Sequence, residues 1–220
     1  MRVVSPVRAV LILVLVALLS GCGYNQIQQK DEAVKAGWSE VINQYKRRAD
    51  LIPNLVNTVK GYAAQEKSTL VAVTEARASA TQVKVDASTI TNPAAFQQYQ
   101  QAQDRLSGVL GRLMMIQERY PDLKSNQNFL ALQSQLEGTE NRIAIARRDY
   151  NQSVQDFNTT LRTFPQVFWA KTMYASSKPM VLFSATAQAQ SAPTVSFDTT
   201  PPPVPGAAPG SPPPAPPATK

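Results

Sequence analysis

The chain of 220 residues has no histidine and a single cysteine. Without an imidazole base, its own residues cannot assemble a Ser-His-Asp or Cys-His catalytic site. One cysteine excludes an internal disulfide and a thiolate zinc cluster, because both need further cysteine or histidine residues. The sequence also lacks a nucleotide-binding glycine loop and a metal-ligand spacing motif. These absences remove the commonest hydrolase designs, argue against redox chemistry and lead us to expect no cofactor.

The excess of positive charge is modest. The formal net charge is +7, and removal of Arg2 and Arg8 with an N-terminal signal would leave +5. A charge of this size does not require nucleic acid, and export would separate the chain from that partner. A basic face could rest against anionic lipid headgroups, but a helical surface with slightly more basic than acidic residues explains the excess more simply.

The N-terminal segment has the layout of an export signal. Arg2 and Arg8 precede an uninterrupted apolar run over Ala9–Leu19, which is shorter than the about 20 apolar residues of a membrane-spanning helix. Leu19–Cys22 (LSGC) resembles the lipobox of bacterial lipoproteins, which predicts cleavage before Cys22 and acylation of its thiol. The alternative is an uncleaved signal anchor. Either reading of residues 1–21 predicts attachment to a membrane.

The C-terminal composition changes after residue 175. Pro201–Pro217 is mostly proline, which cannot supply helical or sheet hydrogen bonds. We predict a disordered or polyproline II tail over residues 176–220. It would be a spacer, a ligand for a proline-binding partner or, as we favour, a solubilising tail. The predicted division is a signal over residues 1–21, a helical domain over 22–175 and this tail.

Between these ends, three long segments space apolar residues by three or four, as helices do. The first runs from Val34 to Val73 and carries Pro53 in the middle of its apolar stripe. A proline there removes a helical hydrogen bond and clashes with the carbonyl of Ala49. Either one long helix kinks at Pro53, or Asp50 caps a new helix. The unbroken phase of the stripe favours a single helix.

The second segment begins at Asn92-Pro93, where asparagine can cap the helix and proline fits its first turn. Gly108 and Gly111 interrupt its stripe. Because each glycine costs a helix ~1 kcal/mol relative to alanine, the pair predicts a close approach of another helix. The third segment follows a cap at Ser125 or Asn126.

No strand pattern occurs, and the third segment ends at Phe164-Pro165. Short loops between long helices make sequential helices antiparallel neighbours. The sequence therefore predicts an all-α fold, an antiparallel up-and-down helical bundle.

Several long motifs resemble the LemA family. They are RRADLIPNLVNTVKGYA (Arg47–Ala63), EARA (Glu75–Ala78), YPDLKSNQNFLALQSQLEGTENRIAIARRDYN (Tyr120–Asn151) and RTFP (Arg162–Pro165). The resemblance covers about residues 23–183 and implies a membrane-tethered, exported four-helix bundle without established catalytic residues. Four helices would require a chain reversal at Pro53 or a short fourth helix after Pro165.

Two polar clusters flank the apolar stripes. The first lies near Pro53 and the second flanks the third stripe. Their members are Arg47, Arg48, Asp50, Glu137, Glu140, Arg147 and Arg148. A carboxylate metal site is one interpretation, but the bundle version uses Glu-x-x-His pairs and this chain has no histidine. We favour an ion network that fixes helix register, in which Glu140 and Arg147 are structural and would form a pair.

A second apolar region follows the third segment. Phe168-Trp169, Met173-Tyr174 and Val181–Phe183 carry its apolar side chains. The region could contact the membrane surface, where tryptophan and tyrosine gather, or a partner protein. We favour folding back onto the helices, because an exposed hydrophobic strip is a liability in water.

Two classes of function remain. The favoured one is a membrane-tethered envelope bundle that is not an enzyme and serves as a scaffold or adaptor for another envelope protein. The alternative is an acidic-residue metal binder or an enzyme of unknown reaction. Gly23 after the cysteine is not the aspartate that retains lipoproteins at the inner membrane. We therefore expect a location on the exported side of the membrane, and the outer membrane in a bacterium with two.

The lipobox makes a direct prediction. Cys22→Ala should abolish incorporation of a clickable fatty acid and leave the uncut precursor, because the thiol would carry the diacylglyceryl group whose two chains give stable anchoring. In-gel fluorescence and N-terminal mass spectrometry measure both outcomes. An unlabelled wild-type chain that still begins near Met1 would instead identify a signal-anchored protein.

Overall fold

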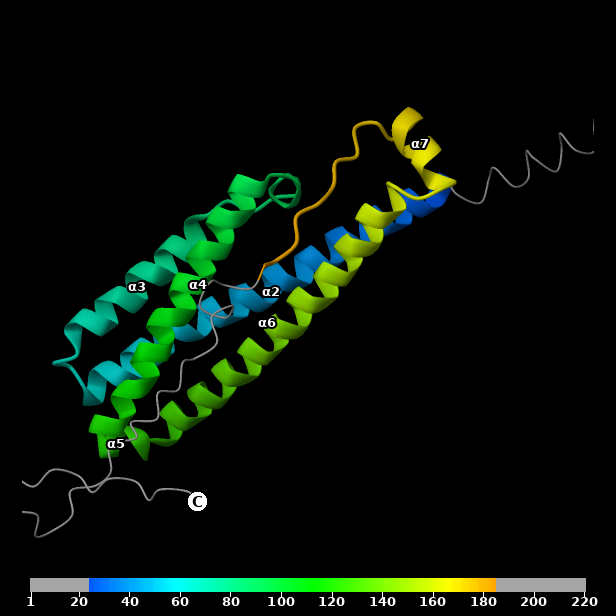
Figure 1. The fold of residues 1–220 in the computed structure, drawn as a ribbon. Coiled ribbons are helices and arrows are strands. Elements are labelled where there is room, and N and C mark those ends of the chain that lie inside the picture. Colours follow the sequence, from blue (N-terminus) through cyan, green and yellow to red (C-terminus); the bar gives the residue numbers. More distant parts are fainter. Residues whose placement is uncertain (1–23, 185–220) are drawn as a thin grey trace, which may run out of the picture. The chain divides into compact units, whose positions relative to one another are not determined.

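The computed structural model describes residues 24–184, and within them every regular element is a helix (Figure 1). Four long helices form the bundle: α2 (Tyr24–Tyr62), α3 (Lys67–Gln82), α4 (Pro93–Met115) and α6 (Gln127–Thr160). Shorter helices are η1 (Thr89–Thr91), η2 (Ile116–Arg119), α5 (Pro121–Lys124) and α7 (Gln166–Thr172). The all-α bundle predicted from the sequence is confirmed.

The long helices pack as two connected pairs. α2 lies against α6 along much of its length, α3 lies against α4, and α3 also contacts α2 (Figure 1). No packing of comparable extent joins α4 to α6. In the part of the chain from residue 24 to residue 184, none of the helices combines the length and the apolarity needed to cross a membrane.

The predicted helix caps form. The side chain of Asn92 accepts hydrogen bonds from the backbone of Ala94 and Ala95, and Pro93 occupies the first turn of α4. Asn126, rather than Ser125, caps α6 by accepting from the backbone N–H of Phe129 at 3.0 Å. These side chains satisfy amide groups that have no partner within the helix.

The chain reversal that separates the first two helices is not where we expected it. A short helix, α7, does follow Pro165, but the fourth long helix is α3, because the first predicted segment divides into α2 and α3 at the turn Ala63–Glu66 and not at Pro53. These four residues contain neither glycine nor proline, so they do not resemble a break. Leu70 returns to the same core from α3, which is why the apolar spacing continues across the turn.

The two glycines of α4 also differ from expectation. A Cβ atom added at Gly108 or Gly111 would meet nothing within 4 Å. The predicted close approach at these residues is therefore wrong for residues 24–184. The close approach occurs instead at Gly37 in α2, where an added Cβ would lie 3.4 Å from Cα of Tyr150 in α6.

α2 continues through Pro53, which confirms the single helix. Because proline has no N–H, the carbonyl of Ala49 loses its helical donor. Arg77 of α3 replaces that donor, with its Nε 2.8 Å from the Ala49 oxygen. The arginine of the EARA motif thus satisfies the backbone group that the proline leaves without a partner.

Two hydrophobic clusters fill the bundle. The first, here called the turn-end cluster, includes Ile52, Val59, Leu113 and Phe129. The second, here called the aromatic cluster, includes Trp38, Phe96, Tyr99, Tyr150 and Phe183. In α2, α4 and α6 most of the residues between the two clusters are polar.

The contact between Arg77 and Ala49 is testable by a mutant cycle. Arg77→Met should lower the free energy of unfolding by about 1–3 kcal/mol, because a partly buried carbonyl loses its donor. In a Pro53→Ala background the same replacement should cost less, because residue 53 can then donate to Ala49. Urea unfolding followed by circular dichroism measures the cycle.

Arg105→Met is the matched control, since Arg105 lies exposed on α4. An equal cost of Arg77→Met in both backgrounds would show that the arginine does not compensate for the proline.

Candidate functional site

A charged side chain, Arg48, lies between the two hydrophobic clusters. It is 1% exposed and is the largest fully buried side chain among residues 24–184. Tyr45 and Ile52 precede and follow it by three and four residues on the buried face of α2. Helical periodicity therefore places the arginine inside the bundle, where its charge requires partners.

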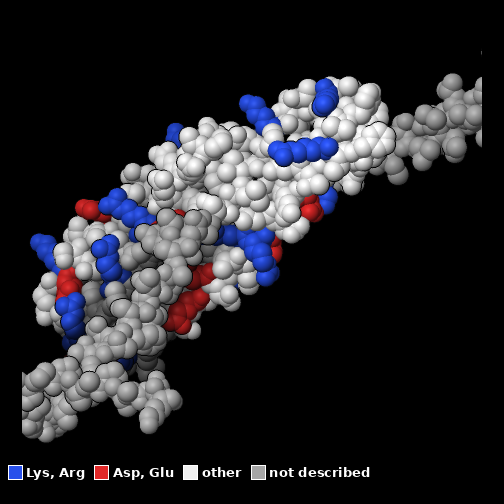
Figure 2. Space-filling model, in the orientation of Figure 1, with Lys and Arg blue, Asp and Glu red and all other residues white. Residues whose placement is uncertain are grey.

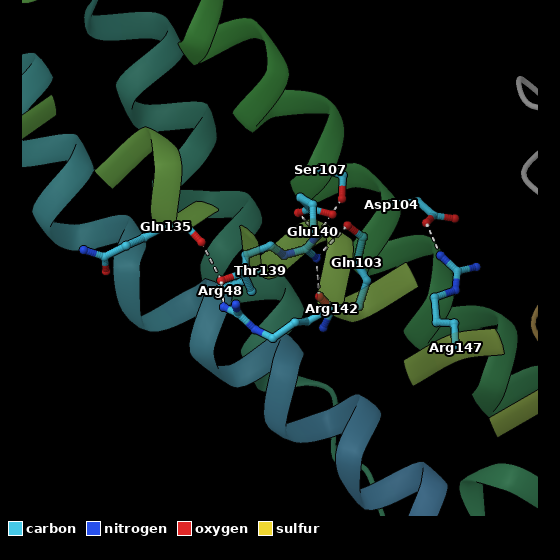
Figure 3. A network of polar contacts seen from close by, with 9 residues as sticks. All are labelled: Arg48, Gln103, Asp104, Ser107, Gln135, Thr139, Glu140, Arg142 and Arg147. Atoms are coloured by element: carbon cyan, nitrogen blue, oxygen red, sulfur yellow. Dashed lines mark hydrogen bonds and ion pairs between the residues drawn. The ribbon is translucent and has the colours of Figure 1, made fainter. Parts of the chain in front are cut away.

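Three helices meet at this guanidinium (Figure 3). Its Nη1 donates to Ser107 Oγ of α4 at 2.6 Å and to Glu140 Oε1 of α6 at 2.7 Å. Its Nη2 donates to Gln103 Oε1 at 2.8 Å and to the Gln103 carbonyl at 3.3 Å. The ring of Tyr45 lies 5.0 Å from the guanidinium carbon, and burial raises the pKa of this phenol. The contacts hold α2, α4 and α6 at fixed relative heights.

The polar layer extends along α6. Arg142 Nη2 donates to Thr139 Oγ1 at 2.9 Å, and its Nε donates to Gln44 Oε1 at 3.1 Å. Thr139 in turn donates to the carbonyl of Gln135 at 2.7 Å. Five residues beyond Arg142, Arg147 faces Asp104 of α4 at 3.9 Å (Figure 3).

The structure brings together some of the seven predicted polar residues. Arg48 and Glu140 form an ion pair, and Arg147 pairs with Asp104. The other four are exposed and lie outside the contacts of Arg48: Arg47, Asp50, Glu137 and Arg148.

The expected pairing of Glu140 with Arg147 is wrong. Both lie on α6, and seven residues correspond to a rise of about 10 Å along the helix. Glu140 instead reaches across to Arg48. Gln103 and Ser107 were missed because neither carries charge, although Gln103 follows Tyr99 and precedes Leu106 at the spacing of a buried stripe.

A groove opens beside this layer, between α4 and α6. Its volume is ≈ 480 Å³, and its apolar lining includes Leu110, Met114 and Leu136. Gly111 also lines it. Glu140 belongs both to the groove lining and to the buried layer, because its side chain is 46% exposed and also forms the ion pair with Arg48. Among residues 24–184, no group of three or more His, Cys, Asp or Glu side chains could hold a metal ion.

The apolar region after α6 has a buried part and an exposed part. Met180 and Phe183 are buried in the aromatic cluster, which confirms the predicted folding back for this part. Phe164, Phe168 and Met173 remain exposed around α7.

Comparisons with known proteins agree with the motifs. The model of the LemA family matches residues 37–197. A relative described as Protein LemA, from Metamycoplasma hominis, is 24% identical over 140 residues, which are 64% of this chain and 60% of the relative. The match thus spans less than two thirds of that relative's length.

The Arg48–Glu140 pair predicts asymmetric effects on stability. Glu140→Ala should lower the free energy of unfolding by about 1–3 kcal/mol, because the buried charge of Arg48 then lacks its carboxylate partner. The loss should be smaller than for a fully buried pair, because the side chain of Glu140 is half exposed. Adding Arg48→Met should recover part of the loss. Urea unfolding measures both variants.

Glu137→Ala, an exposed change one turn away on α6, serves as the control and should have little effect. Strictly additive losses for Arg48→Met and Glu140→Ala would contradict the coupling.

Proposed function

This chain belongs to the LemA family, and we propose that it is a membrane-tethered envelope protein that acts as a scaffold or adaptor for another envelope protein, without enzymatic activity. The observation that carries the proposal is the groove between α4 and α6. α2 packs against α6, and α3 packs against α4 and α2, more extensively than α4 packs against α6. A smaller groove of ≈ 380 Å³ also opens between α2 and α3. The pair of α4 and α6 leaves an apolar surface that another protein can cover.

The groove fits one face of a partner helix. Ser107 and Gly111 are one turn apart on α4 and line it, and an added Cβ at Gly111 would meet nothing within 4 Å. Small residues at this spacing let a second helix approach closely. Glu137 and Glu140 add carboxylates to the lining from α6. The partner helix would therefore carry apolar residues with a lysine or arginine beside them.

The polar layer supports a structural rather than a catalytic role for its charges. The guanidinium of Arg48 donates to three side chains and to one backbone carbonyl. Glu140 serves as its counter-ion. Groups engaged in this way hold helices in register, and a rigid bundle is suited to present a docking surface.

The α7 end of the bundle supports attachment to a membrane. Cys22, the predicted lipidation site, lies outside the described residues but only two positions before the start of α2. α7 contacts α2, and Gln166 of α7 donates to Gln26 near the start of α2.

Around α7, exposed apolar side chains meet basic surface. Phe164 is 87% exposed and Phe168 is 60% exposed. Figure 2 shows lysine and arginine side chains over the same end of the bundle. Aromatic and basic groups together suit a lipid interface. In this proposal the α7 end faces the membrane, which is the outer membrane in a bacterium with two.

In-cell photo-crosslinking tests the adaptor role. A photoreactive residue at Gly111 should give a discrete adduct with one envelope protein, and the same residue at Gln101, an exposed position of α4 outside the groove lining, should not. Glu137→Lys should weaken the Gly111 adduct by repelling the basic partner helix. A chain truncated before Ala192 should retain it.

Mass spectrometry identifies the adduct and its attachment site. Equal capture at Gly111 and Gln101, or an adduct that disappears with the tail, would overturn the proposal that the groove is the docking surface.

A further inference from the structure

An extended segment of the chain, Lys178–Phe183, lies along α6 and is held by asparagine side chains. Asn158 donates to the carbonyl of Met180 and accepts from its N–H, both at 2.8 Å. Asn151 donates to the carbonyl of Phe183 at 3.0 Å and accepts from its N–H at 2.9 Å. Each asparagine thus binds both backbone groups of one residue.

The spacing of these contacts follows from helix and strand geometry. Seven residues of α6 rise about 10 Å, and three residues of an extended chain advance about 10 Å. Asparagines seven apart on a helix therefore match every third residue of an antiparallel extended segment. The four hydrogen bonds involve no side chain of the bound segment, so they do not depend on its sequence.

Val181, one of the two residues between these contacts, is held through its backbone as well. The carbonyl of Val181 accepts from the hydroxyl of Tyr150 at 2.8 Å, and its N–H donates to the carbonyl of Ile90 at 2.8 Å. Burial raises the pKa of Tyr150 above its ordinary value. A phenol is protonated at neutral pH even without this shift, so Tyr150 is a donor there.

Two side chains of the segment enter the bundle. The ring of Phe183 lies between those of Phe96, Tyr150 and Trp38, with centroids 4.7, 5.4 and 6.0 Å away. Met180 lines a cavity of ≈ 220 Å³ together with Ile90 and Phe157, and the cavity also has a polar side formed by Asp31, Lys35 and residues 176–178. The phenylalanine pocket is filled, whereas space remains beside the methionine.

We propose that this surface of α6 and η1 is a peptide-binding site, and that Lys178–Phe183 is its internal ligand. The external ligand is an extended segment of a partner protein with a phenylalanine and, three residues before it, a side chain larger than methionine. The site shares no lining residue with the groove between α4 and α6, so it does not depend on the proposed adaptor function.

The remaining space near Met180 favours a partner protein over a second copy of this chain. An identical segment from a second copy would make no contact that the attached segment lacks. The attached segment competes with any external segment at an effective concentration of the order of mM. An external ligand therefore needs contacts that the attached segment does not make. A partner residue that fills the cavity gains contacts that the internal ligand does not make.

The test uses the full chain with Phe183→Ala, which weakens the internal ligand. The probe is a fluorescein-labelled peptide of sequence KPFVLF with blocked ends, in which phenylalanine replaces methionine. Fluorescence anisotropy should show about tenfold or more tighter binding to the variant than to the wild-type chain, and tighter binding than KPMVLF.

Methylation of the peptide nitrogen at positions three and six removes the N–H groups that donate to the asparagine side-chain oxygens. It should weaken binding about tenfold or more, and Asn151→Ala with Asn158→Ala should do the same. Asn141→Ala, an exposed asparagine of the same helix, should leave binding unchanged. Absence of binding to the folded Phe183→Ala chain, or equal binding of the methylated peptide, overturns the proposal.

If Phe183→Ala does not fold, hydrogen exchange on the wild-type chain decides. Millimolar KPFVLF should raise exchange at the amides of Met180 and Phe183, and unchanged protection overturns the proposal. Exchange that rises with protein concentration, together with a dimer in sedimentation, would assign the site to a second copy and overturn the partner assignment.

Discussion

Burial of the Arg48 guanidinium is the constraint on which the bundle depends. A charge removed from water must be met by hydrogen-bond acceptors and a counter-ion, and here α4 and α6 supply them through Gln103, Ser107 and Glu140. Because these acceptors must lie at one height, the layer fixes the register of three helices and divides the apolar core into two clusters. Ser107 of α4 and Glu140 of α6 bind the arginine and also line the groove, where the two helices do not pack closely against each other.

The neighbouring residue completes the connection of α2 to the other long helices. The side chain of Arg48 contacts α4 and α6, while the carbonyl of Ala49 accepts from Arg77 of α3. That carbonyl is available because Pro53 cannot donate to it. Two successive residues of α2 thus contact all three other long helices, one through a side chain and one through the backbone. Pro53, in the middle of an apolar stripe, therefore makes possible the hydrogen bond between α2 and α3.

The sequence predicted those features that depend on local chemistry. Helix caps such as Asn92, the continuity of α2 and the all-helical fold follow from residues close to one another in the chain. The turn at Ala63–Glu66 was not predicted, because its residues also suit a helix and the apolar spacing resumes in α3. The partner of Glu140 was not predicted either, since pairing across helices depends on their relative heights. Packing between the helices sets those heights, and the spacing of residues along one helix carries no information about them.

The pairing of α2 with α6 affects how the chain can fold. The two helices are joined by contacts between residues far apart in sequence, such as Lys30 with Asp156 at 2.9 Å. The hairpin of α3 and α4 is more local, so its loop-closure entropy is smaller and it can form earlier. During synthesis at 5–20 residues per second, α2 waits about 5–20 s between its own completion at Tyr62 and that of α6 at Thr160. Throughout that interval its apolar stripe has no α6 to pack against, so the part of α2 that α6 covers in the folded bundle lacks its partner within the chain.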